Sequence, residues 1–180
     1  MVVILGIASV SLLTVTKAVT GSYRVSVERL NIGAIGSQAM ANFVDAMRLA
    51  KTSSLSPVPA SPFFAQTVSF ERSERTLNGG TVWHDPETIL YDPVLGEVRW
   101  IENAGTANAN ITFRCNGVAP LLQGETANGL DDNGNGLIDE PGFCLTIAGG
   151  VLTASLTLQR NAPEGGVTMR TWTRSIQCRN

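Results

Sequence analysis

MVVILGIASVSLLTVTKAVT, residues 1–20, opens the chain and carries Lys17 as its only charged side chain. At about 1.5 Å per residue, a helix of this length reaches roughly 30 Å, which matches the hydrocarbon thickness of a bilayer. A helix that is apolar on nearly every side cannot remain in water. The segment therefore predicts an element that crosses a membrane or forms the buried core of a helical assembly.

The opening segment lacks the features of a cleaved secretory signal. A signal peptide begins with a basic region, whereas no Lys or Arg precedes the apolar run here. Apolar side chains continue at spacings near three and four as far as Leu49, and the pattern ends at Lys51. We therefore expect one helix over residues 1–51, with its apolar half, 1–20, in a membrane or in a filament core.

Glycines and prolines divide the rest of the chain. Gly21, Gly33 and Gly36 each weaken a helix by about 1 kcal/mol relative to Ala and favour a bend. Prolines in residues 52–66 exclude regular helix there, and the composition favours an extended linker rich in Pro and Ser. Residues 67–180 then form a globular head.

The head has the period of β-strands. Short runs rich in β-branched and aromatic residues alternate with turns such as NGG, DP and PEGG. Roughly seven or eight strands with hairpin-length gaps favour an antiparallel sheet or sandwich. The expected fold class is therefore α+β, with a long N-terminal helix and an antiparallel β head. The expected core residues are Val68, Phe70, Val82, Trp100, Ile111, Phe113, Leu145, Leu156, Leu158, Met169 and Trp172.

The charge of the chain argues against nucleic-acid binding. Its 13 basic and 15 acidic side chains give a formal net charge of −2 and form no blocks, so there is no electrostatic footprint for a polyanion. Charged residues make up only 16% of the chain, a balance typical of secreted β-rich proteins.

The three cysteines lie in the C-terminal half. In an exported chain they allow one disulfide and one leftover thiol, with three possible pairings. We favour Cys115 with Cys144, because these residues flank one loop, and this leaves Cys178 over. Three reduced core cysteines in a cytosolic protein are the alternative.

Residues 128–142, NGLDDNGNGLIDEPG, contain the sharpest local motif. Its order, D-x-N-x-N-G-x-x-D-E, places oxygen-bearing side chains so that they can wrap a hard cation. It resembles the EF-hand calcium loop through nine positions, but Gly142 stands where a bidentate Glu would close the shell. We expect structural calcium with a Kd of roughly 0.1 to 1 mM; an Asn/Gly turn with scattered acids is the alternative. The expected ligands are Asp131, Asn133, Asn135, the Leu137 carbonyl, Asp139 and Glu140.

No pattern indicates an enzyme. The single histidine, His84, precedes Asp85 and has no nucleophile or metal partner at a recognisable spacing, so we expect it in a surface turn. The chain contains no GxSxG, HExxH or phosphate-loop motif. Trp83, Tyr91 and Trp100 could line a ligand groove but fit core and cross-strand positions better.

The N-terminal pattern, MVVILGIASVSLLTV followed by a long amphipathic continuation, resembles the type IV pilin superfamily, including the type II secretion pseudopilins, over about residues 1 to 50. In that family the apolar run follows a cleavage glycine and a glutamate at the fifth mature position. Both are absent here, either because the sequence starts five residues late, which we favour, or because the protein is not processed as a pilin; no residue of this chain takes the role of that glutamate. The resemblance implies a pilin-like fold in which the N-terminal helix drives assembly. The implied assembly residues are Val2, Val3, Ile4, Leu5, Gly6, Ile7, Leu12, Leu13 and Val15.

The resemblance implies a structural subunit of an extracellular type IV pilus-like filament, either a major or a minor pilin or pseudopilin. Its partners would be copies of itself and, before extrusion, inner-membrane assembly machinery. It would lie in the cytoplasmic membrane first and at the cell surface afterwards. The alternative is a single-pass, membrane-anchored β-domain binding module. Apolar periodicity beyond the length of a bilayer favours assembly, since a simple tether gains nothing from it.

Overall fold

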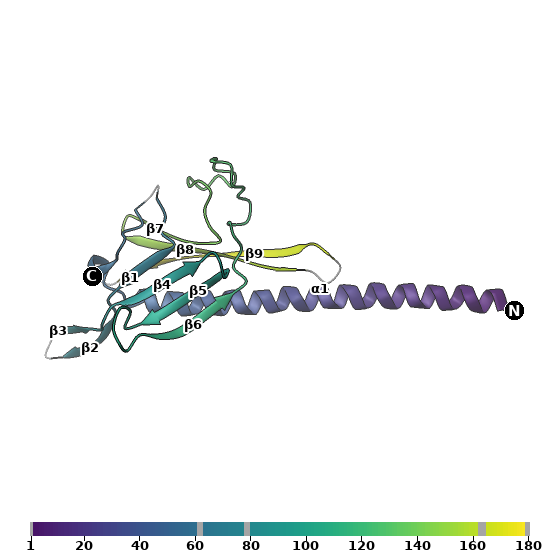
Figure 1. Ribbon diagram of the computed structural model, residues 1–180, viewed down its shortest axis with the longest axis horizontal. Coiled ribbons are helices and arrows are strands. Elements are labelled where there is room, and N and C mark those ends of the chain that lie inside the picture. The colour runs from purple at the N-terminus through teal and green to yellow at the C-terminus, as the bar shows by residue number, and fades with distance from the viewer. Residues whose placement is uncertain (1, 61–62, 78–79, 162–164, 179–180) are drawn as a thin grey trace.

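A long helix and a β-rich head make up the protein. The computed structural model describes residues 2–60, 63–77, 80–161 and 165–178, without the side chains of 2–11 and 74–77. Helix α1 (Val2–Arg48) is followed by a short 3-10 turn (Thr52–Ser54) and nine strands. Figure 1 shows α1 extending far beyond the strands, with the N-terminus at its free end. The predicted α+β fold, with a long N-terminal helix and antiparallel sheets, is confirmed in this coarse form.

Within the described residues, the nine strands form three antiparallel sheets. The four-stranded sheet contains, in spatial order, β1 (Thr67–Phe70), β4 (Glu87–Asp92), β5 (Glu97–Glu102) and β6 (Asn110–Asn116). The three-stranded sheet contains β7 (Phe143–Ala148), β8 (Val151–Asn161) and β9 (Val167–Gln177). A separate hairpin contains β2 (Ser73–Leu77) and β3 (Gly80–Trp83).

Backbone hydrogen bonds join the two larger sheets. The chain leaving β6 pairs with β8, where the N–H of Gln159 donates to the carbonyl of Gly117 at 2.8 Å. Leu145 on β7 exchanges two backbone hydrogen bonds with Ala65, which precedes β1, each at 2.9 Å. The described part of the Pro- and Ser-rich stretch, 52–60 and 63–66, therefore pairs with the head, which a free linker would not do.

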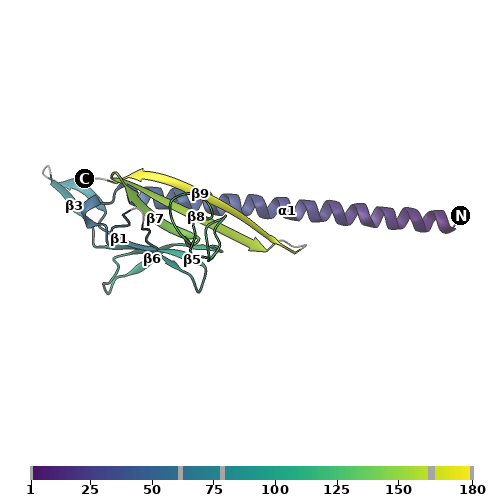
Figure 2. The ribbon, with the colours of Figure 1, turned by 90° about the horizontal axis from the view of Figure 1, so that it is seen from above.

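The C-terminal part of α1 packs into the head. It contacts β9, β8 and β6, and Figure 2 shows β9 running alongside it. The ring of Phe43 meets that of Phe143 edge-on, with centroids 6.0 Å apart. The larger buried side chains of the helix are eight, three and four residues apart, which places them on one helix face. They are Ile32, Met40, Phe43 and Met47.

Gly36 permits the close approach of α1 to β9. A Cβ atom at this position would lie 2.4 to 2.5 Å from three ring atoms of Trp172, distances that real side chains do not tolerate. Trp172 is itself buried. The helix continues through Gly36, so this glycine serves packing between elements.

The predicted core is confirmed in part. Six of the expected residues are buried: Val68, Phe70, Leu145, Leu156, Leu158 and Trp172. The others are half-buried: Val82, Trp100, Ile111, Phe113 and Met169. Trp100 and Phe113 still pack against the buried cluster, whereas Val82 belongs to the separate hairpin.

Candidate functional site

The predicted calcium loop lies in the long connection between β6 and β7. Figure 1 shows this connection rising away from the sheets. Gly134 and Gly136 have φ angles of +74° and +89°, a region that glycine enters without steric cost. The tight backbone expected from these glycines is therefore present.

Asp131 organises the middle of the loop. Its Oδ1 accepts hydrogen bonds from the N–H groups of Gly134 at 2.7 Å and Asn135 at 3.2 Å. Its Oδ2 accepts from the N–H of Gly136 at 2.8 Å. Turns of this kind wind the backbone around a side-chain oxygen. The alternating oxygens of the motif are thereby gathered into one compact loop.

Asp139 ties the end of the loop to its beginning. Its two carboxylate oxygens accept from the N–H of Asn128 at 3.1 Å and from that of Gly129 at 2.9 Å. Asp139 has a φ angle of +50°, which Asp tolerates better than most residues. These hydrogen bonds thus link the end of the ligand-bearing stretch to its beginning.

Glu140 is fully buried and incompletely satisfied. Its Oε1 accepts from the side-chain amide of Asn135, whereas its Oε2 has no hydrogen-bond partner among the described residues. An unpartnered buried carboxylate oxygen is costly. A bound cation would offset this cost.

Glu125 is a second incompletely satisfied carboxylate of the same connection. Its Oε1 accepts from the N–H of Asn133 at 3.0 Å, and its buried Oε2 has no hydrogen-bond partner in the part of the chain that the structure describes. The sequence motif did not identify Glu125, because it precedes the D-x-N-x-N order and belongs to no known spacing. Hard oxygen donors with unused lone pairs suit calcium, so the residues present fit the ion.

No three His, Cys, Asp or Glu side chains within the described ranges gather into a metal-ligand group. The predicted ligand set relies instead on amide and carbonyl oxygens as well as carboxylates. Asp131 and Glu140 each contact Asn135, at its backbone and side-chain nitrogen respectively. The loop therefore brings these three predicted ligands together.

A buried ion pair elsewhere in the head provides a contrast. Glu87 on β4 pairs with Nε of Arg72 at 2.9 Å and accepts from Nε1 of Trp100 at 2.8 Å. Burial raises the pKa of Glu87, and the charge of Arg72 opposes this rise. Both carboxylate oxygens of Glu87 are satisfied, unlike those of Glu125 and Glu140. We assign Glu87 a structural role.

The structure also places the single histidine and two of the aromatic residues that the sequence singled out. His84 is exposed between β3 and β4, as expected. Tyr91 is buried and donates its hydroxyl to the carbonyl of Ala119 at 3.0 Å. Trp100 packs against the core and bonds Glu87. These aromatic residues therefore serve packing and cross-strand contacts.

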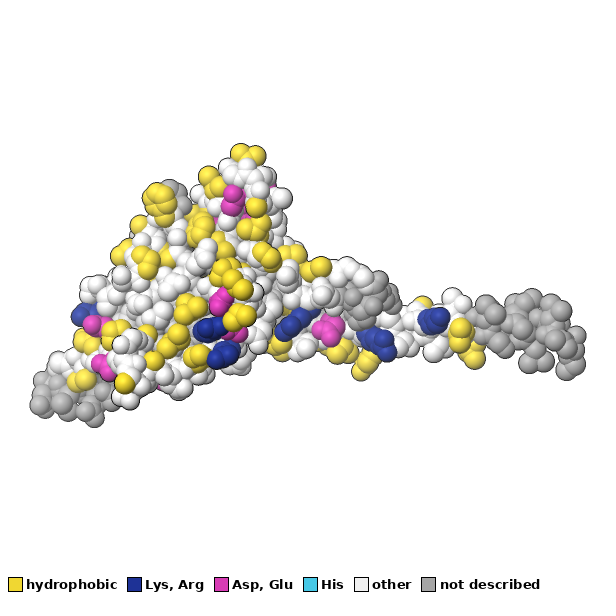
Figure 3. Space-filling model, viewed as in Figure 1, with side chains coloured by type: hydrophobic (Ala, Val, Ile, Leu, Met, Phe, Trp, Pro, Cys, Tyr) yellow, Lys and Arg dark blue, Asp and Glu magenta, His cyan; other side chains and the backbone are white. Residues whose placement is uncertain are grey.

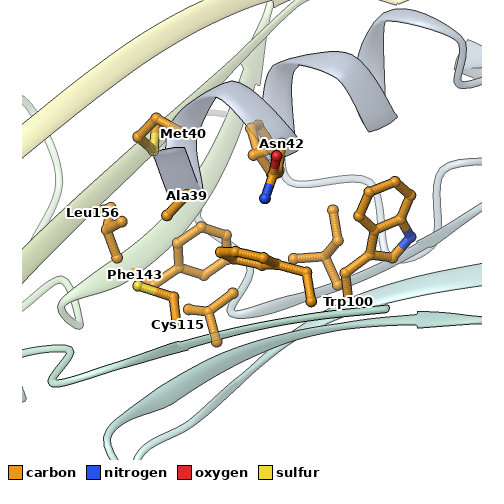
Figure 4. A pocket seen from close by; sticks show the side chains of 11 residues that line it. Ala39, Met40, Asn42, Trp100, Cys115, Phe143 and Leu156 are labelled. Atoms are coloured by element: carbon orange, nitrogen blue, oxygen red, sulfur yellow. The ribbon is translucent and has the colours of Figure 1, made fainter. Parts of the chain in front are cut away.

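The predicted Cys115–Cys144 disulfide is not formed: both are buried free thiols, as is Cys178. Cys115 on β6 and Phe143 on β7 line one small apolar cavity under α1 (Figure 4). Neighbouring residues of a strand point to opposite faces, so Cys144 points away from that cavity. Two cysteines that flank a loop in sequence thus occupy different faces.

The cavity beside Cys115 is too small to be a ligand site. Its volume is about 20 Å³, and Ala39, Met40 and Asn42 of α1 lie on one side of it (Figure 4). Such a volume holds about one water molecule. It therefore offers room for a methyl group and for little else.

Replacing Cys115 with Val should raise stability and remove a pH dependence. Burial raises the pKa of Cys115 to about 11, from 9.0. The unfolded thiol therefore ionises first, and stability present below pH 9 is lost as the pH rises toward 11. Linkage gives a loss of about 1.4 kcal/mol per pH unit in this window. The added methyl group contributes roughly 0.8 kcal/mol at neutral pH.

Urea unfolding of the wild type and Cys115→Val at pH 8, 9 and 10 measures both effects. The variant should have a higher free energy of unfolding than the wild type at pH 8, and this free energy should fall less steeply above pH 9. Parallel slopes would show that Cys115 stays accessible to ionisation in the folded state.

Residues 12–20 of α1 are all exposed. Leu12 is 70% exposed, and Leu13 and Val15 are exposed as well. The other predicted assembly residues lie outside the described side chains: Val2, Val3, Ile4, Leu5, Gly6 and Ile7. The hydroxyl groups of Thr16 and Thr20 donate to carbonyls one turn earlier, both at 2.8 Å. These hydroxyls are therefore compatible with apolar surroundings.

Over the residues described, α1 includes no stretch that is both long and apolar enough to cross a membrane.

No model of a known protein family matches this chain, and comparisons with curated proteins and with solved structures likewise return no match.

Proposed function

We propose that this chain is a structural subunit of an extracellular type IV pilus-like filament, either a major or a minor pilin or pseudopilin. It would lie in the cytoplasmic membrane before assembly and at the cell surface afterwards. Copies of the chain would pack through their N-terminal helices, with the β heads outside.

One observation carries the proposal: an exposed apolar stripe runs along α1 beyond the head. Its members are spaced by three or four residues and are Leu12, Val15, Val19, Tyr23, Val27 and Leu30. At 3.6 residues per turn they fall within an arc of about 120°. Charged residues occupy a different face, as with Lys17, Arg24 and Glu28. A stripe of this kind calls for a partner helix.

A second copy of the chain is the partner that the stripe suits best. Within the described residues, the head covers α1 only from about Ile32 onward, so the stripe stays open in the single chain. A lipid tether that buried the whole stripe, as far as Leu30, would place Arg24 and Glu28 against hydrocarbon on the opposite face, which is costly. Packing between helices can instead bury the stripe and leave these charges in water.

The proposed role as a filament subunit is tested by removing detergent from the full chain in the absence of lipid. Negative-stain electron microscopy should then show filaments of uniform width. Amorphous aggregate would contradict the proposal. Dispersed particles that enter vesicles without forming filaments would favour the membrane-anchored binding module.

We also propose that calcium braces the loop at Asp131, Asn133, Asn135, Leu137, Asp139 and Glu140, with Glu125 as an additional oxygen donor. Two buried, unpartnered carboxylate oxygens support this, on Glu125 and Glu140. With a Kd near 1 mM, about 10 mM calcium stabilises the folded chain by roughly 1.4 kcal/mol. The ion would fix the loop and supply no chemistry.

Calcium should reverse the order of stability of Glu140→Gln and the wild type. Gln keeps the size and the contact with Asn135, but removes the unpaired buried charge, so the variant should be at least as stable as the wild type in chelator. In calcium it should be less stable, because its affinity falls about tenfold, or roughly 1.4 kcal/mol. Thermal unfolding with and without calcium measures both states.

Asp132→Asn is the matched control. Its carboxylate accepts from Thr126 at 3.2 Å and Asn128 at 2.9 Å and lies outside the proposed ligand set. Calcium titration of this variant should give an affinity within about threefold of the wild type. If Glu140→Gln and Asp132→Asn weakened calcium binding equally, the effect would come from net charge and Glu140 would not be a ligand.

A further inference from the structure

An apolar cleft opens between the calcium loop and the segment that precedes β1. Phe63, Phe64, Gly136, Leu137 and Ile138 line it, and its volume is about 360 Å³. Phe63 is 74% exposed and Ile138 is 54% exposed. Figure 3 shows apolar side chains on the projections that rise from this side of the head. We name this feature the tip cleft.

The connection that forms one wall of the tip cleft is acidic. The connection that supplies Leu137 and Ile138 also carries five carboxylates, and a single bound calcium ion would leave it negative. These carboxylates are Glu125, Asp131, Asp132, Asp139 and Glu140. A partner for the tip cleft should therefore present apolar side chains next to a positive charge.

The β4–β5 turn of the same chain has these properties. Oδ1 of Asp92 accepts from the N–H groups of Val94 at 3.0 Å and Leu95 at 3.1 Å, and Gly96 follows with a φ angle of +59°. This rigid turn holds Val94 91% exposed and Leu95 61% exposed. It presents an apolar knob of two neighbouring side chains.

A polar groove adjoins this knob. The turn forms one side of it, Gln159, Arg160 and Asn161 form another, and its volume is about 360 Å³. Arg160 makes none of the ion pairs found among the described residues. The groove thus offers a guanidinium group, without an ion-pair partner among the described residues, beside Val94 and Leu95.

We infer that the Val94–Leu95 turn of one copy docks into the tip cleft of the next, with the acidic loop facing Arg160. The inference rests on the proposed filament function. Because the two surfaces differ, the contact is heterologous, and repeated contacts of this kind form an open assembly. Attraction between the acidic connection and Arg160 fixes the orientation of the copies.

Cysteine cross-linking tests the contact directly. The full chain carrying both Leu95→Cys and Ile138→Cys is assembled without detergent and oxidised mildly. Every copy then supplies both halves of the contact, so denaturing electrophoresis should show a ladder of covalent oligomers. The native cysteines are buried and should not react. The matched control pairs Leu95→Cys with Val151→Cys, at the exposed end of β8, and should remain monomeric.

Filaments that form without a ladder in the double variant would overturn the contact and leave the proposed function standing. A ladder in the Val151→Cys control as well would also overturn it, since the linkage would then be unspecific. Absence of filaments in the wild type would overturn the proposed function and the contact together.

Arg160→Gln provides a measurement without cysteines. The concentration needed for assembly should rise severalfold, and its dependence on salt should weaken, because an attraction between charges is lost. An unchanged concentration and salt dependence would overturn the charged part of the contact.

Discussion

We expect that a chain lacking residues 1–27 remains a soluble monomer and forms no filament. The deletion removes most of the exposed stripe and ends before Ile32, which is the first large helical side chain buried against the head. The new chain begins at Glu28, and an acidic residue in the first turn stabilises a helix. Sedimentation velocity should show a single species of monomer mass, whereas the full chain sediments as large assemblies.

Point substitutions distinguish the effect of the apolar stripe on assembly from the effect of shortening the helix. Val19→Gln together with Val27→Gln should abolish assembly, while helix content is retained, because Gln has a higher helix propensity than Val. Lys17→Gln, on a different face, should leave assembly intact. If the 1–27 deletion or the double variant still formed fibres, α1 would not be the assembly element.

Gly36→Ala destabilises the head by about 2 to 4 kcal/mol. The new Cβ would lie 2.4 Å from the ring of Trp172, so the ring or the helix must shift within a packed core, and overpacking of this kind is costly. For a chain of this size the melting temperature should fall by roughly 4 to 16 °C. Thermal unfolding followed by circular dichroism measures this shift.

Gly33→Ala is the matched control on the same helix. The nearest atom to its added Cβ is Nη1 of Arg170 at 3.3 Å, the end of a flexible side chain that can move. Replacing a helical glycine with alanine then stabilises by about 0.5 to 1 kcal/mol. Equal effects of the two substitutions would show that Gly36 is not a site of close approach.

The elements of this fold were predictable because their signals are local. Apolar spacing identified the helix to within a few residues of Arg48, and alternation identified a β-rich head after residue 67. Strand pairing could not be predicted from the sequence, since β1 pairs with β4 and the chain after β6 crosses to β8. Such contacts join residues distant in sequence, and no local pattern records them.

Close packing escaped prediction for a related reason. From the sequence, Gly36 is a weak point in a helix; in the structure, it makes room for Trp172, which lies far along the chain. The disulfide prediction used only the positions of Cys115 and Cys144 along the chain. It missed that Cys115 and Phe143 line the same cavity, so that Cys144, the residue after Phe143, points away from Cys115.

The candidate calcium loop was the most predictable part of the site, because its oxygen donors are close in sequence. The hydrogen bonds of Asp131 and Asp139 follow from short-range turns. Glu125 was missed, since its link to Asn133 depends on how the connection folds back. Its unpartnered oxygen becomes apparent only from burial.

Electron cryomicroscopy of the assembly formed by the full chain without detergent locates α1 directly. We expect a central rod of packed helices in which the stripe from Leu12 to Leu30 faces neighbouring copies, with the β heads on the outside. Assemblies held together by the heads, with α1 exposed to solvent or embedded singly in lipid, would contradict a role for this helix in building a filament.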